Sequence, residues 1–295
     1  MQDIVLITGA NGHLAKILSK YLAKDYEVRF LTTKKNNRKS HFYWNINKKY
    51  IDQNALENCS HIIHLAGFPI LKRWTRKNKS IMYDSRVKST DILLQECKLM
   101  NIKPKTFICA SAIGIYNQDI KEKIYEDSQK GNDWIAKMAI DWENAANQFK
   151  EIGSRVIQLR ISLIFSELNG FLKYNLLSVK YGIGLIIGNA KRNINWMHVD
   201  DISRFIKECL NHKKYNGAYN MASDENISQE KILQLIQRNL FPYSMIIKIP
   251  NFIVNILLGN RTKIINSNIH IANKRLKKEG FTCEFNSLLD IITKM

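Results

Sequence analysis

A short glycine-bearing turn between a buried strand and an amphipathic helix constrains the fold of this chain more than any other feature. Residues 4–7 are Ile-Val-Leu-Ile, a continuous apolar run typical of a strand that is buried on both faces. The turn reads Thr8-Gly-Ala-Asn-Gly-His-Leu-Ala15, and apolar residues then recur at helical spacing up to residue 22. Because such strands occur in parallel sheets that helices cover, this start predicts an α/β fold.

The same rhythm of strand and helix continues through the first half of the chain. Further strands are predicted at residues 28–31, 61–66, 106–110 and 156–160, and long helices at 77–99 and 133–150. Their alternation indicates right-handed crossovers and a Rossmann-like, doubly wound parallel sheet. After residue 162 the regular alternation ends, and loops, helices and a short strand at 218–221 follow. This pattern predicts a smaller C-terminal α/β substrate lobe.

This pattern divides the chain into two expected parts. The Rossmann domain takes residues 1–165, with later segments returning to it at about 190–225, and residues 166–295 form most of the substrate lobe. No linker rich in proline or glycine separates the parts, so we expect them to pack closely on each other.

Composition and charge exclude several classes of protein. Hydrophobic residues make up 45% and charged residues 24% of the chain, as in ordinary globular proteins, so global disorder and fibrous repeats are excluded. Lysine and arginine total 45 against 26 acidic residues, but the lysines are scattered and accompany many Asn and Ile residues, which indicates a coding bias. We expect no specific nucleic-acid partner and no membrane contact. The net charge of +19 keeps an RNA- or membrane-associated role as the third alternative.

Cysteine usage and the start of the chain favour a cytoplasmic protein. The five cysteines are odd in number and form no Cys-x-x-Cys pair, so neither a disulfide framework nor a zinc site is expected. No apolar run reaches the roughly 18 residues of a membrane-spanning helix. No basic segment precedes the first strand, so we expect no signal peptide.

The glycines of the first turn suit a pyrophosphate. Gly9 can take the tight turn, and Gly12 lets backbone N–H groups approach a phosphate at the N-terminus of the next helix, where the helix dipole favours anions. The third glycine of the usual dinucleotide fingerprint is Ala15, which still allows close packing of helix on strand. The expected cofactor-binding residues of this turn are Gly9, Asn11, Gly12, His13 and Leu14. A tight turn without a ligand is the alternative.

The end of the second strand favours NADP over NAD. An NAD site needs a carboxylate there for the ribose 2′-hydroxyl, whereas a basic residue accommodates the 2′-phosphate of NADP. The chain instead reads Thr32-Thr33-Lys34-Lys35, with two more basic residues at 38 and 39. Thr32, Thr33 and Lys34 are therefore expected at the 2′ end of the adenosine. In the alternative interpretation these lysines are solvated loop charges.

Several further motifs occur in a fixed order along the chain. They are His64-Leu-Ala-Gly-Phe-Pro-Ile70, Arg73-Trp74, Tyr83-Asp-Ser-Arg-Val87, Ala110-Ser-Ala-Ile-Gly-Ile-Tyr116, Asp141-Trp-Glu143 and Asn195-Trp-Met-His-Val-Asp-Asp201. With the glycine turn, they resemble the "epimerase family protein" branch of the extended short-chain dehydrogenase/reductases, which are similar to NAD-dependent epimerases and dehydratases. Residues 258–281 resemble the small domain appended in that branch, so residues 246–295 are expected to form that C-terminal domain.

The resemblance implies further cofactor contacts. Leu65, Ala66 and Gly67 would line the dinucleotide at the end of their strand. Arg86 would reach the cofactor or its phosphates, with a salt bridge on the helix surface as the alternative. Ser111 and Ile164, which lies in a stretch near the nicotinamide in that branch, complete the expected site.

The acid–base pair of ordinary short-chain dehydrogenases is absent. That pair is a Tyr-x-x-x-Lys on the helix after the strand at 106–110, and here this helix contains no tyrosine. The possible replacements are Tyr83, Tyr116 and Lys137, and none is assigned as catalytic. The resemblance implies an NADP(H)-dependent oxidoreductase or nucleotide-sugar epimerase-like enzyme with an unknown small-molecule substrate, as a monomer or homodimer. A non-catalytic NADPH-binding sensor or scaffold is the alternative.

Other polar and aromatic residues receive structural interpretations. His61 and His64 are three residues apart on a strand and face opposite sides, so they cannot share a metal. Asp200 or Asp201 is expected to cap a helix that begins near residue 202, and no metal site is predicted. Trp74 and Trp196, in polar loops, either shape a substrate pocket or pack the two lobes together.

Overall fold

The computed structural model describes residues 2–35, 38–265 and 267–295, which divide into two compact units. The first unit takes the residues up to Ile115 together with Asn132–Arg160 and Ile202–Tyr219. The second takes Tyr116–Gly131, Ile161–Asp201 and Asn220–Met295. The chain therefore passes several times between the units, whereas the sequence suggested a change near residue 165 with a return at about 190–225.

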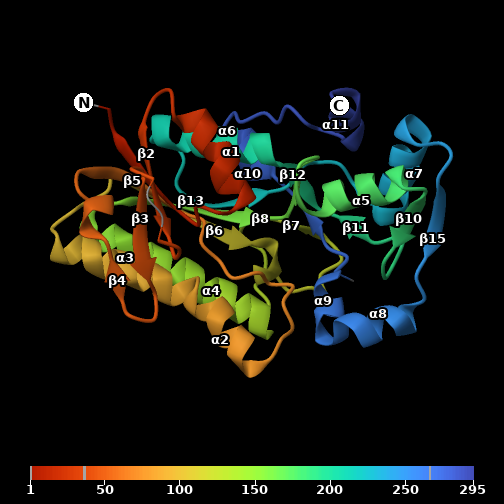
Figure 1. Cartoon of the computed structure of the whole chain (residues 1–295), viewed down its shortest axis with the longest axis horizontal. Helices are drawn as coiled ribbons and strands as arrows, with labels where there is room; N and C mark the ends of the chain where they lie inside the picture. Colours follow the sequence, from red (N-terminus) through yellow and green to blue (C-terminus); the bar gives the residue numbers. More distant parts are fainter. Residues whose placement is uncertain (1, 36–37, 266) are drawn as a thin grey trace. The chain divides into compact units, whose positions relative to one another are not determined.

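An eight-stranded sheet forms the centre of the first unit, in the order β13-β8-β6-β5-β1-β2-β3-β4 (Figure 1). Its strands are β1 (Ile4–Thr8), β2 (Glu27–Thr32), β3 (His41–Asn45), β4 (Tyr50–Ile51), β5 (Cys59–His64), β6 (Thr106–Ala112), β8 (Arg155–Ile161) and β13 (Gly217–Met221). The pairs from β3 through β2, β1 and β5 to β6 are all parallel, and β4 is antiparallel to β3. This is the doubly wound, Rossmann-like sheet that the sequence predicted.

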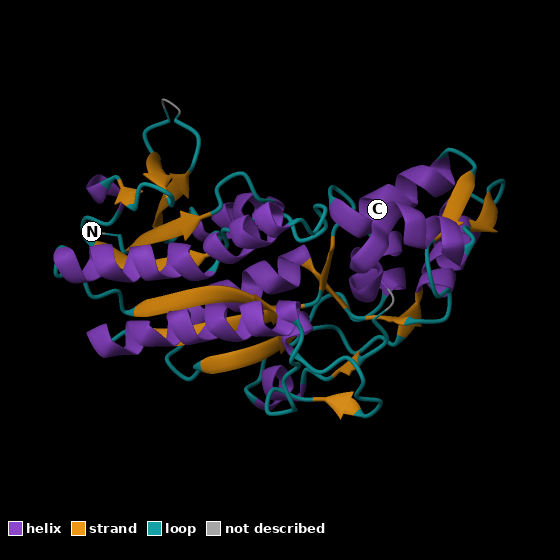
Figure 2. Cartoon of the chain, turned by 90° about the horizontal axis from the view of Figure 1, so that it is seen from below, coloured by secondary structure: helices purple, strands orange, loops and turns teal. Residues whose placement is uncertain are grey.

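Helices cover the sheet on both faces (Figures 1 and 2). The helices associated with this sheet are α1 (His13–Leu22), α2 (Arg76–Asp84), α3 (Val87–Leu99), α4 (Trp134–Asn147) and α6 (Val199–Asn211), with short 3-10 turns η1 (Gln53–Ala55), η2 (Ile113–Ile115) and η3 (Gln148–Ile152). Between the layers, Leu6, Ile7, Ile62 and Phe107 are fully buried. Complete burial of one such side chain is worth about 1.5–3 kcal/mol.

One prediction of secondary structure was wrong in the first unit, and two strands were missed. The single helix expected at 77–99 is two helices, because the backbone breaks at Ser85 and Arg86, whose side chains turn back to bind the loop after β5. Strand β3 and the edge strand β4 were not predicted. Strand β3 is rich in aromatic residues, and only Trp44 among them is fully buried, so it lacks the aliphatic run of the central strands.

The second unit consists of two-stranded ladders and helices around one apolar core. Its strands pair as β9 (Leu163–Phe165) with β12 (Trp196–His198), β11 (Asn193–Ile194) with β14 (Ile227–Ser228), β10 (Ile183–Ile186) with β15 (Met245–Lys248) and β7 (Lys123–Ile124) with β16 (His270–Ile271). Its helices are α5 (Gly170–Lys180), α7 (Gln229–Leu240), α8 (Asn251–Leu258), α9 (Thr262–Ile265), α10 (Lys274–Lys278) and α11 (Leu288–Thr293), with the turn η4 (Gly259–Arg261). Phe165, Trp196, Leu233 and Leu288 lie at the centre of the core.

Asp201 does not have the capping role that the sequence suggested. Helix α6 begins at Val199, so Asp201 lies within its first turn. Its fully buried carboxylate accepts hydrogen bonds from the backbone N–H groups of Glu284 and Phe285, at 2.8 and 3.1 Å. The carboxylate therefore fixes the C-terminal segment of the second unit, which the local sequence could not reveal.

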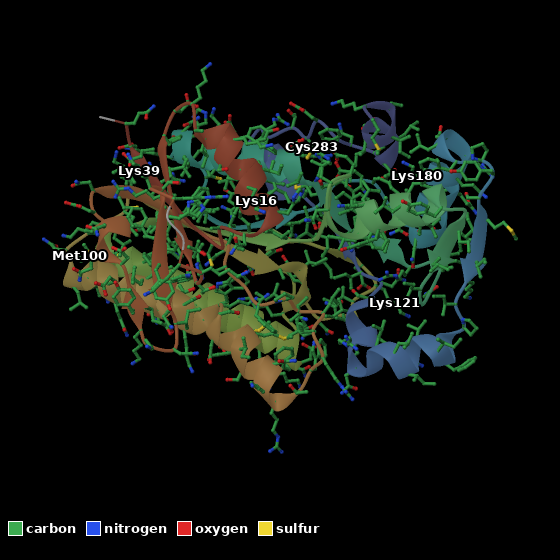
Figure 3. The ribbon with its side chains drawn as sticks, viewed as in Figure 1. Lys16, Lys39, Met100, Lys121, Lys180 and Cys283 are labelled. Atoms are coloured by element: carbon green, nitrogen blue, oxygen red, sulfur yellow. The ribbon has the colours of Figure 1, made fainter. Side chains whose placement is uncertain are left out.

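The structure also bears on the distribution of the lysines and on membrane-spanning helices. The lysines labelled in Figure 3 lie on separate elements of both units: Lys16 on α1 and Lys39 before β3 in the first, and Lys121 and Lys180 in the second. Within residues 2–35, 38–265 and 267–295, no helix has the length and hydropathy to cross a membrane.

Candidate functional site

The turn after β1 has the geometry that its glycines predicted. Gly9 has a φ of 76°, in the left-handed region, and the Gly12 N–H donates to its carbonyl oxygen at 2.7 Å. A Cβ atom on Gly9 would lie 3.0 Å from the Leu65 carbonyl oxygen, so only glycine fits. Helix α1 then starts at His13 without a side-chain cap and without an acidic residue in its first turn. Such an N-terminus is suited to an anion.

The loop after β5 lies directly against this turn. Thr8 Oγ1 accepts hydrogen bonds from the backbone N–H groups of Leu65 and Ala66, at 3.1 and 3.0 Å. Ser85 Oγ accepts from the Phe68 N–H at 2.8 Å. The structure therefore brings together two of the predicted loops, the glycine turn and the Leu-Ala-Gly stretch.

Arg86 holds the far end of the same loop. Its guanidinium donates to the carbonyl oxygens of Phe68 and Met82, both at 3.1 Å, and lies 5.3 Å above the Trp142 ring. A Cβ on Gly67 would meet this guanidinium at 3.0 Å. Burial lowers the Arg86 pKa to about 10, and no carboxylate in the described part of the chain pairs with it. The salt bridge considered as an alternative is therefore not formed.

His64 lies beneath both loops and is completely buried. Its Nδ1 is 2.8 Å from Thr8 Oγ1, and its Nε2 is 3.0 Å from Ser89 Oγ on α3. Burial lowers the pKa of His64 to about 4, so the ring is neutral at pH 7. Sequence reasoning missed the roles of Thr8 and Ser89, because their common partner His64 lies 56 and 25 residues away from them along the chain.

The residues expected at the 2′ end of the adenosine follow β2. Thr32 is buried, and its Oγ1 accepts a hydrogen bond from the Lys34 N–H at 3.2 Å. Thr33, Lys34 and Lys35 are exposed, and the Lys35 ammonium lies 5.5 Å from the centre of the Tyr43 ring. The loop is thus basic and open to solvent at the carboxyl end of a central strand.

The Asp-Trp-Glu motif of α4 has a partner for each side chain. Asp141 accepts from the Tyr83 hydroxyl at 3.2 Å, and Trp142 packs edge-on against the His64 ring. Glu143 is buried and binds Arg160, with Nε–Oε1 at 2.7 Å and Nη2–Oε2 at 2.8 Å.

The remaining predicted cofactor residues occupy different places. Ser111 donates its hydroxyl to Glu143 Oε1 at 2.9 Å, so it belongs to the buried Arg160–Glu143 cluster. Ile164 is the central residue of β9 in the second unit, where it pairs with Met197 of β12.

The three candidates for the proton donor lie in different surroundings. Tyr116 is buried, and its hydroxyl donates to Asn220 Oδ1. Lys137 is exposed on α4. Burial and the neighbouring Asp141 carboxylate raise the pKa of Tyr83, the reverse of the lowered pKa that a lysine neighbour would produce.

Both tryptophans singled out by the sequence pack against another aromatic ring. Trp196 is fully buried, stacks on Phe165 at 4.6 Å between ring centroids, and donates its Nε1–H to Glu225. It therefore packs the core of the second unit. Trp74 packs on Trp134 at 5.3 Å. Across the described ranges, which omit residues 1, 36, 37 and 266, no three His, Cys, Asp or Glu side chains are grouped to hold a metal ion.

Comparison of the sequence with known proteins gives a consistent match. The model of the "NAD dependent epimerase/dehydratase family" matches residues 5–222. An epimerase family protein of Staphylococcus epidermidis is 28% identical over 295 residues, covering 96% of this chain and 95% of the relative. One from Staphylococcus aureus is 26% identical over 307 residues, covering 98% of this chain and 99% of the relative.

Solved structures share the fold at lower identity. The human epimerase family protein SDR39U1, crystallised with NADPH, superposes with a TM-score of 0.85 at 19% identity and covers 99% of this chain and 98% of its own. The UDP-glucuronic acid 4-epimerase of Bacillus cereus, in complex with UDP-glucuronic acid and NAD, gives a TM-score of 0.79 at 15% identity, with coverages of 98% and 96%.

Proposed function

The chain belongs to the NAD dependent epimerase/dehydratase family, and from that premise we propose that it binds NADPH and acts as an oxidoreductase or epimerase-like enzyme on an unidentified small molecule. The observation that carries the proposal is the pair of loops after β1 and β5. The backbone of Gly9 packs on Leu65, and the uncapped N-terminus of α1 follows directly. Backbone N–H groups at such a helix start are a common site for a pyrophosphate.

The close approach that the glycines allow supports the fit of a dinucleotide to these residues, and so does the basic charge of the loop after β2. A Cβ at Gly9 would lie 3.0 Å from the Leu65 carbonyl oxygen, and one at Gly67 would lie 3.0 Å from the Arg86 guanidinium, so both glycines allow a close approach in these loops. The residues proposed to hold the cofactor, all in the first unit, are Gly9, Asn11, Gly12, His13, Leu14, Thr32, Thr33, Lys34, Leu65, Ala66, Gly67 and Arg86. For Ser111 we propose a structural role on Glu143, because that carboxylate accepts its hydroxyl proton.

These positions indicate what the cofactor and the protein would each contribute. A bound nicotinamide would donate or accept a hydride. The chain itself would hold the phosphates at α1 and keep the Leu65–Phe68 segment in place through Thr8, Ser85 and Arg86. The NADPH complex of human SDR39U1 supports the choice of NADPH, and so does the basic loop that follows β2.

Calorimetric titration of the full chain with NADPH and NADH tests this proposal. We expect NADPH to bind at least about tenfold more tightly, which corresponds to ~1.4 kcal/mol. A phosphate–ammonium hydrogen bond is worth roughly 1.5–3 kcal/mol, so Lys34→Ala with Lys35→Ala should remove the preference. The control is Lys48→Ala with Lys49→Ala, which removes equal charge from the β3–β4 turn. Equal affinities for the two cofactors would refute the choice of NADPH.

A non-catalytic NADPH-binding sensor or scaffold is the second candidate. It is favoured by Tyr83, whose proton is held more tightly by Asp141, and by the lack of a Tyr-x-x-x-Lys pair on α4. Incubation of the NADPH-loaded protein with a panel of sugars, quinones and aldehydes separates the two candidates. Loss of NADPH fluorescence supports the enzyme, and a cofactor that never turns over supports the sensor.

A further inference from the structure

Strand β5 buries two histidines that face opposite sides of the sheet. His61 lies beside Asp3, at 3.6 Å from Nε2 to the carboxylate, and His64 lies beneath the two loops of the proposed cofactor site. Both rings are at least nine-tenths buried, and burial lowers both pKa values to about 4. The two histidines thus share strand, burial and charge state, and they differ in what their ring nitrogens contact.

The hydrogen bonds around Thr8 determine which nitrogen of His64 carries the proton. A hydroxyl oxygen has two acceptor positions and one proton to donate. Thr8 Oγ1 accepts from the N–H groups of Leu65 and Ala66, so both acceptor positions are in use. Its proton must then be donated to His64 Nδ1, 2.8 Å away. Nδ1 is therefore unprotonated, and the neutral ring carries its proton on Nε2.

The other side of the ring continues the chain of donors. His64 Nε2–H donates to Ser89 Oγ at 3.0 Å. The single proton of the Ser89 hydroxyl is then donated to the carbonyl oxygens where α2 ends and α3 begins, that of Ser85 at 2.8 Å or that of Arg86 at 3.0 Å. One ring thus joins the glycine turn, through Thr8, to the helix break that holds the loop after β5.

We propose that His64 is a positioning residue: as the Nε2–H tautomer it holds the Gly9 turn and the Leu65–Ala66 backbone at the separation that a bound dinucleotide pyrophosphate requires. This inference rests on the proposed cofactor binding. It assigns to a histidine a role that a hydrophobic residue of similar size could not fill, since Thr8 would lose the acceptor for its proton.

The surroundings of the ring leave no substitute for these hydrogen bonds. The rings of Trp44, Phe107 and Trp142 lie about His64, with centroids 6.2 to 6.3 Å away, and the residue has no exposed surface. The charged group that faces it is Arg86, whose positive charge adds to burial in keeping the ring neutral. Water therefore cannot replace the ring as an acceptor for Thr8.

A matched pair of variants tests the positioning role. His64→Leu and His61→Leu remove the same ring from the same strand, and urea unfolding measures what each costs in stability. We expect His64→Leu to weaken NADPH binding at least tenfold, while His61→Leu changes the dissociation constant less than threefold. His64→Gln should restore most of the affinity, because its amide oxygen can accept from Thr8 and its N–H can donate to Ser89. Equal dissociation constants for both leucine variants would overturn the proposal.

Two further measurements keep the inference separate from cofactor binding. If the wild-type protein binds neither NADPH nor NADH, the proposed function fails, and amide hydrogen exchange at Leu65 and Ala66 then decides the positioning role. Exchange should accelerate at least tenfold in His64→Leu and remain unchanged in His61→Leu. If His64→Leu does not fold, ¹⁵N NMR of the wild-type imidazole decides: a protonated Nε2 with a bare Nδ1 is expected, and the reverse tautomer refutes the network.

Discussion

Each compact unit buries one arginine almost completely, Arg160 in the first and Arg192 in the second. Arg160 meets Glu143 through two parallel hydrogen bonds, and Ser111 donates to the same carboxylate. Arg192 has no partner for its guanidinium in the described part of the chain, and its Nε is buried without an acceptor. Two equally buried cations of one residue type thus have opposite surroundings.

The difference lies in how the cost of removing a charge from water is met. This desolvation cost is offset only when an opposite charge lies close to the buried ion and when acceptors bind its remaining N–H donors. Arg160 has both. For Arg192, burial is the sole cause acting on the pKa, which falls to about 10, so no neighbouring carboxylate stabilises the charged form. Arg160 therefore has a charge partner within its own unit, whereas no side chain in the described part of the chain pairs with the Arg192 guanidinium.

The largest expected effect comes from giving Arg160 the surroundings of Arg192. Glu143→Ala leaves that guanidinium buried and unpaired, and we expect it to lower the free energy of unfolding by about 3–5 kcal/mol. Urea unfolding followed by circular dichroism measures the change. The control is Glu151→Ala, which removes an exposed carboxylate that pairs with Lys98 at 2.9 Å and should cost less than about 1 kcal/mol. Similar costs for both variants would contradict the assigned role of burial.

The first unit also buries groups that avoid charge by losing a proton. His64 has a pKa of about 4 in the folded protein and an ordinary value near 6.5 when unfolded. Between these values the unfolded chain binds a proton that the folded chain does not, so stability falls as the pH drops from about 6.5 to 4. A shift of this size corresponds to ~3 kcal/mol. His64→Gln should lose stability over this range by about that much less than the wild type, as urea unfolding at pH 7 and pH 4 would show. Parallel curves would contradict it.

Replacing the unpaired arginine should change stability in the opposite direction. Arg192→Met keeps much of the side-chain volume and removes a buried charge that has no partner, so we expect the free energy of unfolding to rise by about 1–2 kcal/mol. Arg160→Met is the matched control and should be destabilising, because it leaves the Glu143 carboxylate unpaired. Urea unfolding at pH 7 measures both. A loss of stability in Arg192→Met would mean that the guanidinium has compensation in solution.

Elements that depend on the local sequence could be predicted, whereas contacts between side chains that are distant in sequence could not. Strand β1, the Gly9 turn and helix α1 follow from local periodicity and from a residue that must adopt a positive φ, so all three were predictable. Asp-Trp-Glu was noticed as a motif, but its partners Tyr83 and Arg160 lie 58 and 17 residues away. Those contacts depend on how strands and helices register in three dimensions.

In the candidate site too, contacts between residues that are distant in sequence could not be predicted. Gly9 and Gly12 were identified from their spacing between a buried strand and a helix. Gly9 has a positive φ, and a Cβ on Gly12 would lie 3.1 Å from the Gly9 carbonyl oxygen. The hydrogen bonds that join Thr8 and Ser89 to His64 link residues 56 and 25 positions apart, and nothing in the local pattern distinguishes these hydroxyls from others. The break at Ser85–Arg86 was missed for a related reason, because the side chains of both residues also contact Phe68, which is 17 and 18 residues away in the loop after β5.

The smallest effect is expected at Ser111, a residue of the Arg160–Glu143 cluster that the resemblance associated with the cofactor. Its hydroxyl is one of the donors that hold the Glu143 carboxylate, and the two hydrogen bonds from Arg160 remain when it is removed. A hydrogen bond to a charged group contributes roughly 1.5–3 kcal/mol when no other donor compensates. With Arg160 still in place, we expect Ser111→Ala to cost about 1 kcal/mol in urea unfolding and to leave the NADPH dissociation constant within about twofold of the wild type. Ser111→Thr, which keeps the hydroxyl, is the control for stability. A large loss of NADPH affinity in a stable Ser111→Ala protein would instead place this hydroxyl at the cofactor.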